Sequence, residues 1–329
     1  MKPYQQKDFT RLKFRKAGVL LGILAGCGLL GASLPAQSEL AISGQLSYNV
    51  ADRDSEDDLV FQRNGFSESL FRLVYTKALE NEMSLQVVEE IGIAEGEGSL
   101  DSRRQEVILK GDFGGVRFGQ GNDAGDGNLN GDLSGTAVIQ PIASQAAALD
   151  YAGGNYNGFD PGRGERIRYD SPKFGDSGVA SFQIGEDDET EIALRYNVGI
   201  GGGQLRIGAF ITNTGSDVDQ DSSGILVAYG MDNGLNFAVV SSSRDNAAGS
   251  EDGDFTAIKI GFKTGMHAFS FISGTSENPG NPVETDSTGL AYVYTLEPGI
   301  EVFAATNEFD SDNDAVDEDF LIAGTRIKF

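Results

Sequence analysis

Residue types that support catalysis or covalent cross-linking are scarce in this chain of 329 residues. It has one cysteine, Cys27, and one histidine, His267. A single cysteine excludes an intramolecular disulfide, and loss of the N-terminal segment would leave no thiol at all. A hydrolase needs a nucleophile beside its base, but His267 follows a predicted turn at Thr264-Gly265 and no Gly-x-Ser-x-Gly motif occurs. We therefore expect a protein that is not an enzyme.

Basic residues and long apolar runs are also scarce beyond the first 36 residues. Residues 1–36 hold six of the 25 Lys and Arg and one of the 50 Asp and Glu, which leaves 19 against 49 and a net charge of −30. Such a surface repels nucleic acid and anionic lipid alike. No segment after residue 36 is apolar over the 18 or more residues that a membrane-spanning helix needs.

Residues 1–36 have the order of a secretory signal peptide: six basic residues, an apolar run over 17–34, and small residues up to Ala36. We predict cleavage there and a mature domain over residues 37–329. Two alternatives exist. The apolar run reaches the length of a spanning helix, although glycines and Cys27 interrupt it. Residues 24–27 match a bacterial lipobox, which would place a lipid on Cys27, but the apolar run continues through Leu34, where a lipoprotein usually turns polar.

Apolar and polar residues alternate with period two over repeated segments of about ten residues, the length of a tilted membrane-spanning strand. Leu40, Ile42 and Leu46, for example, share one face, and Ser43 lies on the other. The pattern predicts sixteen strands, at residues 40–50, 68–77, 82–90, 104–111, 115–121, 165–171, 178–186, 190–199, 203–213, 223–231, 234–243, 254–264, 266–276, 286–296, 299–308 and 318–329. A soluble sandwich also alternates, because its apolar face meets a second sheet.

The links between these strands favour a membrane barrel over a sandwich. Every second link is a short turn rich in Gly, Asn and Asp, such as Asp232-Asn233-Gly234, whereas the others are mostly long and acidic. An even number of antiparallel strands with short turns at one end and long loops at the other is typical of an outer-membrane barrel. Sixteen strands leave an aqueous channel, whereas eight fill with side chains.

The longest link, residues 122–164, has 43 residues without strand-like alternation. It contains nine glycines, five aspartates and no lysine, and Arg163 is its one basic residue. A loop of this length inside a compact domain is usually functional or disordered. Because a strand precedes it and another follows it, it must lie over the sheet or inside it. Within it, residues 141–150 are predicted to form a short helix that has a proline near its start.

The mature chain resembles the Gram-negative general porin family. The resemblance rests on the terminal Phe329, on Gly111-Asp-Phe-Gly-Gly-Val-Arg-Phe-Gly-Gln120 before the long link, and on Arg166-Ile-Arg-Tyr-Asp-Ser-Pro172 after it. It implies an all-β, sixteen-stranded antiparallel transmembrane barrel in the outer membrane, with lipid and lipopolysaccharide around it. It also implies a homotrimer, a constriction loop over about residues 122–164, and recognition of Phe329 by the outer-membrane assembly machinery.

The resemblance further implies that acids on the constriction loop face bases on the barrel wall. The predicted acidic residues of the constriction are Asp126, Asp132, Asp150 and Asp160. The predicted basic residues of the wall are Arg72, Arg117 and Arg168, which strand alternation turns inward. Lys110, Arg195 and Arg206 are inward by the same alternation, but nearer other parts of the wall.

Residues 126–132 are similar to the first half of a calcium loop. Oxygen ligands at alternate positions would come from Asp126, Asn128, Asn130 and Asp132. The twelfth position of such a loop carries a bidentate glutamate, and here it is Ala137. A Gly/Asn/Asp turn cluster is therefore the favoured interpretation. Ca²⁺ or Mg²⁺ among the acidic loops is the remaining expectation, and no other cofactor is predicted.

These features predict an outer-membrane porin, a water-filled channel for passive diffusion of small hydrophilic solutes and ions. We expect a preference for cations, because most acids fall in the predicted outer loops. A nutrient-selective channel and a structural or adhesive barrel are the alternatives. An open conductance in lipid bilayers would separate a porin from an adhesive barrel.

Overall fold

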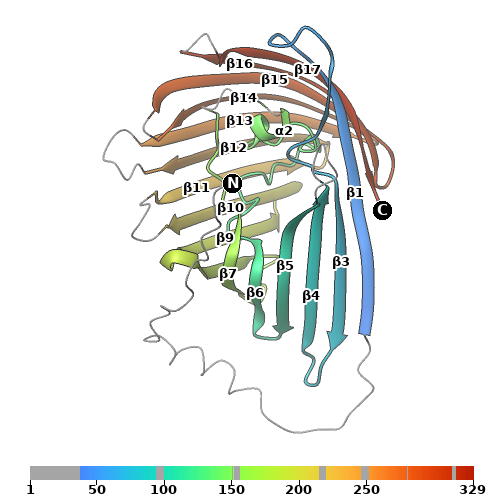
Figure 1. Cartoon of the computed structure of the whole chain (residues 1–329), viewed down its shortest axis with the longest axis vertical. Helices are drawn as coiled ribbons and strands as arrows, with labels where there is room; N and C mark the ends of the chain where they lie inside the picture. Colours follow the sequence, from blue (N-terminus) through green and yellow to red (C-terminus); the bar gives the residue numbers. More distant parts are fainter. Residues whose placement is uncertain are drawn as a thin grey trace, which may run out of the picture. The chain divides into compact units, whose positions relative to one another are not determined.

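The computed structural model describes residues 38–93, 100–149, 151, 156–214, 220–245, 252–279, 281–312 and 316–329. The predicted signal peptide, with Cys27, lies outside the described residues. The unit Gln37–Phe329 is a closed antiparallel β-barrel (Figure 1), which confirms the predicted fold class. No helix in the described ranges is long and apolar enough to cross a membrane.

Within these ranges seventeen strands form one sheet. They are β1 (Ser38–Arg53), β2 (Val60–Arg63), β3 (Leu70–Ala78), β4 (Ser84–Ile93), β5 (Leu100–Gly111), β6 (Gly114–Asn122), β7 (Arg163–Asp170), β8 (Val179–Gly185), β9 (Thr190–Gly199), β10 (Gly203–Asn213), β11 (Ser222–Met231), β12 (Leu235–Arg244), β13 (Gly253–Thr264), β14 (His267–Asn278), β15 (Asn281–Glu297), β16 (Ile300–Ser311) and β17 (Glu318–Lys328). Every predicted strand overlaps one of these.

The barrel closes at β1. The second half of β1 pairs with β17, from Gln45 opposite Lys328 to Arg53 opposite Phe320. The first half of β1 pairs with β3, and the short β2 pairs with β1 further along. β2 and β3 pair with successive stretches of β1, so together they count as one strand of the wall. The barrel therefore has sixteen strand positions, as the sequence predicted.

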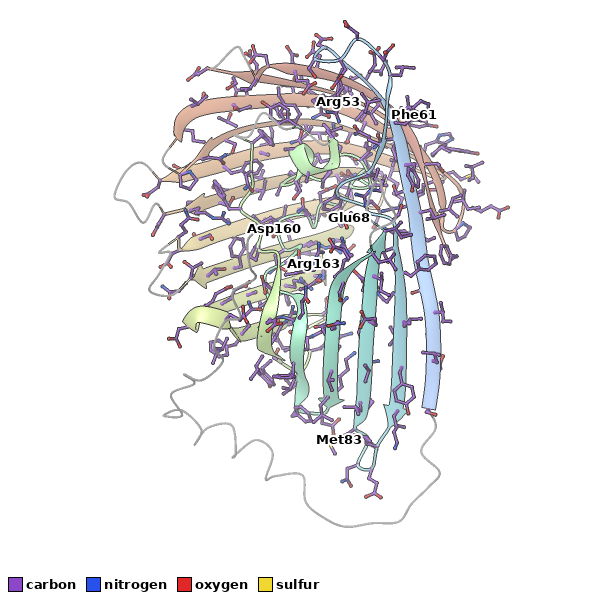
Figure 2. All side chains as sticks on the ribbon, viewed as in Figure 1. Arg53, Phe61, Glu68, Met83, Asp160 and Arg163 are labelled. Atoms are coloured by element: carbon purple, nitrogen blue, oxygen red, sulfur yellow. The ribbon has the colours of Figure 1, made fainter. Side chains whose placement is uncertain are left out.

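Seven short links, of two to eight residues, join alternate strand pairs and meet at one end of the barrel. Figure 2 marks this end with Met83, in the β3–β4 turn, and the opposite end with Phe61, on β2. The β11–β12 turn needs a glycine, because Gly234 has a φ of 95° and a Cβ there would lie 2.0 Å from the carbonyl oxygen of Lys263. The seven predicted turns therefore lie at one end, but the opposite end also has short links, of four residues between β8 and β9 and of two between β14 and β15.

The two faces of the wall differ in polarity. On β13, Ile258 and Ile260 are exposed on the outer face, whereas Lys259 between them points inward and is buried. Large apolar residues are exposed in the same alternating way on most other strands. An apolar outer face and a polar inner face suit a barrel that is surrounded by lipid and filled with water.

The link between β6 and β7 lies against the inner face of the wall, and we call residues 123–162 the inner link. Its apolar anchors are buried, namely Ile139, Ile142, Leu149, Tyr151 and Tyr156. Tyr151, for example, stacks on Phe309 of β16 with ring centroids 4.2 Å apart. The predicted helix is present but shorter, as α2 (Gln145–Leu149), and Figure 1 shows it on the inner side of β12–β16.

Candidate functional site

Polar side chains fasten the inner link along the wall from β8 to β16. Near its start, Gln183 Nε2 on β8 donates to Asp123 Oδ1 at 3.0 Å. In its middle, Lys259 Nζ lies 3.3 Å from Asp132 Oδ2. Further along, Gln140 Nε2 donates to Asn307 Oδ1 on β16 at 3.0 Å. The inner link thus covers this part of the wall and leaves β3–β7 facing it.

The inner face of β3–β7 carries a connected set of charged residues, which we call the wall cluster. It comprises Arg72, Glu90, Arg103, Arg104, Glu106, Arg117, Arg166, Arg168 and Asp170. Arg166 Nη2 lies 2.6 Å from Glu106 Oε1, and Arg117 Nε lies 2.7 Å from Asp170 Oδ2. Six guanidinium groups therefore share the three carboxylates of the cluster, and Arg103 also pairs with Glu68, just before β3, so the basic groups still outnumber the acidic ones.

The guanidinium groups of the wall cluster meet water more than its carboxylates do. The side chain of Arg72 is 40% exposed, whereas its partner Glu90 is 3% exposed. Arg104 and Glu106 are 15% and 0% exposed. Glu90 and Glu106 thus lie beneath these arginines, whereas Asp170, at 15%, is more exposed than its partner Arg168, at 7%. The surface of the cluster that faces the lumen is still positive, because the arginines outnumber the carboxylates.

A β-bulge shapes the wall cluster between β4 and β5. Glu90 is opposite Arg104, but Ile91 is opposite Ser102, so Arg103 is the extra residue. Arg103 Nε donates to Glu90 Oε1 at 3.1 Å, and Arg104 Nε donates to Glu106 Oε2 at 2.8 Å. The bulge therefore places two consecutive arginines on the same inner network, because a bulge re-aims the side chain that it adds.

The three arginines predicted on the wall, Arg72, Arg117 and Arg168, all belong to the wall cluster on the inner face; their role at the constriction stays a prediction. Sequence reasoning did not single out Arg166, although it alternates in phase with Arg168. It also missed Arg104 and the carboxylates, which alternation could have found. The inward direction of Arg103 could not be predicted from alternation, because it depends on the bulge.

The acids predicted at the constriction have different surroundings. Asp132 is buried with Lys259, each side chain 1% exposed, so the prediction that Asp132 faces the permeation path is wrong. Asp126 and Asp160 are half-buried. Asp160 accepts hydrogen bonds from the main-chain N–H groups of Gly127 at 3.0 Å and Leu129 at 3.3 Å, and so ties the inner link to itself. Asp150 lies outside the described residues.

Burial raises the pKa of both half-buried acids. The pKa of Asp160 is raised to about 7 by burial and by the nearby charge of Asp126. The pKa of Asp126 is raised to about 6, chiefly by burial, although Arg163 and Arg195 oppose the shift. Figure 2 shows Asp160 and Arg163 away from the turn end that Met83 marks. Neither acid is fully charged near neutral pH.

The calcium loop, the less favoured interpretation of residues 126–132, does not assemble. Asn128 Nδ2 donates to the carbonyl oxygen of Ala209 at 2.9 Å, and its Oδ1 accepts from Arg195. Asn130 Oδ1 accepts from the main-chain N–H of Ala143 at 3.0 Å. Asp132 pairs with Lys259. The predicted ligands Asp126, Asn128, Asn130 and Asp132 therefore form no common site, because wall residues already take the oxygens of Asn128 and Asp132.

A cavity of about 670 Å³ lies between the start of the inner link and the wall cluster. The inner link contributes Ala124 and Asn128 to its lining. The wall contributes a set of ionisable residues, namely Lys110, Asp112, Arg117, Arg168, Asp170, Lys173 and Arg195. Water and small ions that enter this space therefore meet more basic than acidic side chains.

The C-terminal residue takes part in barrel closure. Phe329 exchanges two main-chain hydrogen bonds with Gly44 of β1, at 2.8 and 3.0 Å. Its ring packs edge-to-face on Phe71 of β3, with centroids 5.7 Å apart. Phe329 therefore joins β1 and β3 on the outer face, and its proposed recognition by assembly machinery remains a prediction.

The apolar outer face, the closed antiparallel wall and the charged inner face define an integral outer-membrane β-barrel with a hydrophilic lumen. The chain belongs to the Gram-negative porin family, whose model matches residues 24–314. The protein is therefore an outer-membrane porin channel of a Gram-negative bacterium and not an enzyme.

Solved porins have the same fold. The anion-selective porin from Comamonas acidovorans has a TM-score of 0.70 and 18% identity, over 89% of this chain and 100% of that one. A loop L8 deletion mutant of OmpT from Vibrio cholerae has a TM-score of 0.65 and 13% identity, over 89% and 99%. A trimer form of Vibrio cholerae OmpT has a TM-score of 0.61 and 16% identity, over 89% and 99%. No curated protein matched the sequence.

Proposed function

We propose that this porin conducts small hydrophilic solutes and ions by passive diffusion, and that the inner link narrows its water-filled channel. The observation that carries the proposal is the position of the inner link, which is fastened from β8 to β16 and faces the wall cluster across a cavity. A segment that is held against one side of the wall reduces the open cross-section of the channel without closing it.

Deletion of residues 124–160 tests the narrowing. We expect a clear rise in single-channel conductance in planar bilayers. Heat-modifiable migration on gels would establish that the shortened barrel is folded. As a milder test, Asp126→Cys should lose conductance when a bulky thiol reagent reacts with it. Asp232→Cys, on the exposed β11–β12 turn, is the control. Unchanged conductance in a folded deletion variant would mean that the inner link does not narrow the channel.

We propose a cation preference that is confined to dilute salt. Exposed acids at the end of the barrel opposite the seven short turns, such as Glu56, Asp57 and Asp58, attract cations to the mouth of the channel. The wall cluster opposes them, because its arginines outnumber its carboxylates and Arg72 is its most exposed group. The Debye length falls from about 10 Å at 0.1 M salt to about 3 Å at 1 M, so the mouth charges are screened first. The ratio of potassium to chloride permeability should therefore fall toward one as the salt concentration rises.

Reversal potentials in potassium chloride gradients measure this preference. A chloride preference in 0.1 M salt would contradict the proposal and would make the wall cluster dominant at every concentration. The Comamonas acidovorans porin is named anion-selective. Asp126→Asn serves as a probe of the remaining charge on the inner link and should lower the potassium preference only slightly, because its pKa of about 6 leaves it partly neutral near pH 6.

We also propose a homotrimer. The outer face of β4–β7 carries a polar row that lipid would not stabilise, and its members are paired in register across the strands: Glu89, Gln105, Gln120 and Glu165. Gln105 and Glu165 are exposed, and Glu89 and Gln120 are half-buried. Gln105 Nε2 donates to Glu89 Oε1 at 3.3 Å. An ionised group that faces hydrocarbon is costly, so contact with a second copy explains this row better.

Native electrophoresis tests the trimer. We expect a heat-labile trimer for the unaltered protein and a lower dissociation temperature for Glu89→Ala combined with Gln105→Ala. Asp254→Ala removes an exposed charge from β13 and serves as the control. A monomer in mild detergent, or equal effects of the two variants, would count against this interface.

A further inference from the structure

A group of three carboxylates lies where the inner link begins. Asp123 follows β6, Glu189 precedes β9, and Glu191 is the second residue of β9. One oxygen from each lies within 4.8 Å of the others. Asp123 and Glu191 are buried, at 9% and 1% exposure, and Glu189 is half-buried. The group is separate from residues 126–132, which are similar to half of a calcium loop, and it joins two segments that are far apart along the chain.

These carboxylates lack a cationic partner. None of the three forms an ion pair with any described residue within 4 Å. The nearest arginines have other acceptors: Arg166 Nη2 pairs with Glu106, and Arg168 Nη1 donates to the main-chain oxygen of Asp123 at 2.8 Å. Two buried carboxylates and a half-buried one this close cannot all be ionised unless a cation or shared protons compensate them.

Unpartnered buried oxygen atoms also point to a ligand at these carboxylates. Glu191 Oε1 accepts from the main-chain N–H of Gly125, but Glu191 Oε2 is buried and has no hydrogen-bond partner. Thr212 is directly opposite Glu191 on β10, is 5% exposed, and has an unpartnered buried hydroxyl as well. Buried polar atoms in folded proteins are almost always partnered by protein, water or an ion.

We propose that Asp123, Glu189 and Glu191 bind a calcium ion that fastens the start of the inner link to the β8–β9 hairpin. All the ligands are oxygens, which hard divalent cations prefer over softer transition metals. Ca²⁺ accepts six to eight oxygens in flexible geometry, which suits ligands from a loop and a strand, and water completes its shell. Mg²⁺ demands a near-octahedral arrangement and gives up its water reluctantly.

The site has a mechanical consequence. Gly125, two residues after Asp123, donates its N–H to Glu191, and Ala124 donates its N–H to Gln183 Oε1 at 2.8 Å. Loss of the ion would leave three carboxylates repelling one another at the point where these bonds hold the inner link. We therefore expect calcium removal to loosen the first residues of the inner link and to increase current noise.

The test uses the whole folded protein, freed of metal with a chelator and then dialysed against labelled Ca²⁺ in 0.15 M potassium chloride. We expect one saturable ion per chain, bound at least tenfold more weakly by Glu191→Gln. This variant keeps an oxygen that can accept from Gly125. Asp232→Asn, which removes one exposed acid elsewhere, should retain the ion. Glu189→Gln, at the half-buried position, is the second variant should Glu191→Gln fail to fold.

Two results would overturn the proposal. One is the absence of a saturable calcium ion in the unaltered protein, which would mean that the carboxylates share protons. The other is equal calcium binding by the unaltered protein, Glu191→Gln and Glu189→Gln, which would place the ion among other acids. A thermal midpoint that rises with calcium in the unaltered protein and in Asp232→Asn, but not in Glu191→Gln, supports it. Equal competition by Mg²⁺ would reject the assignment to calcium.

Discussion

Replacement of Lys259 by methionine is the most direct test of how the inner link is held. Lys259 Nζ lies 3.3 Å from Asp132 Oδ2, both side chains are 1% exposed, and Lys259 also donates to the carbonyl oxygen of Gln140. Methionine fills much of the same volume but carries no charge. Lys259→Met would therefore leave the Asp132 carboxylate buried against the wall without a counter-charge.

The expected loss follows from the burial of this pair. Removal of one partner from a buried ion pair costs about 3–5 kcal/mol, whereas replacement of both partners is often nearly neutral. In the double variant Lys259→Met with Asp132→Asn, the amide oxygen can still accept from the main-chain N–H of Ser134, as Asp132 Oδ1 does at 3.0 Å. We expect the double variant to regain at least about 2 kcal/mol of the loss in Lys259→Met.

Urea unfolding in lipid vesicles gives these differences, and single-channel current noise reports on the inner link itself. Lys263→Met, an exposed lysine four residues along the same strand, is the matched control and should cost little. If Lys259→Met were no more damaging than Lys263→Met, or if the two single substitutions simply added in the double variant, the buried pair would not hold the inner link.

Three further predictions concern pH, barrel closure and processing. The pKa values of about 7 for Asp160 and about 6 for Asp126 lie above the ordinary 3.8, so the folded protein binds more protons than the unfolded chain. Stability is therefore lost as pH rises from about 4 to 7. The thermal midpoint should be lower at pH 8 than at pH 5, and this difference should be smaller in Asp160→Asn. Gly44→Leu should lower the temperature at which the barrel unfolds on gels. A Cβ at Gly44 would lie 2.6 Å from the carbonyl oxygen of Leu70 and 2.8 Å from the Phe329 ring. The control Ile42→Leu should leave this temperature unchanged. Intact-mass measurement of protein from outer membranes should give a chain that begins near Gln37 without lipid, and a mass that fits acylated Cys27 would contradict this.

The strands were predictable because each one must separate lipid from water. Apolar and polar residues therefore alternate along each strand, as at Ile258, Lys259 and Ile260, and turn residues mark where this alternation ends. The short β2 was not predicted, because its four residues lie in an acidic link and pair with β1 alone. A strand that only extends another along the wall leaves little periodic signal.

The partners of the charged residues were less predictable than their directions. Alternation turned Arg117 and Arg168 inward correctly, but their common acceptor Asp170 depends on the register between β6 and β7. The inner link has no such period. Nothing in its sequence therefore separates Asp132, which pairs with the wall, from Asp160, which accepts hydrogen bonds from the main chain of its own segment.

The arrangement of these partners decides where charge acts in the lumen. On the covered part of the wall, Lys259 is neutralised by Asp132 beneath the inner link and cannot reach permeating ions. On β3–β5 the carboxylates Glu90 and Glu106 are covered, and Arg72 above Glu90 is the guanidinium group that meets water most. Positive charge therefore lies on one side of the lumen, opposite a segment whose half-buried acids titrate near neutral pH. A fall in pH from 8 to 5 should strengthen this asymmetry, because it removes negative charge from Asp126 and Asp160 and leaves the arginines unchanged.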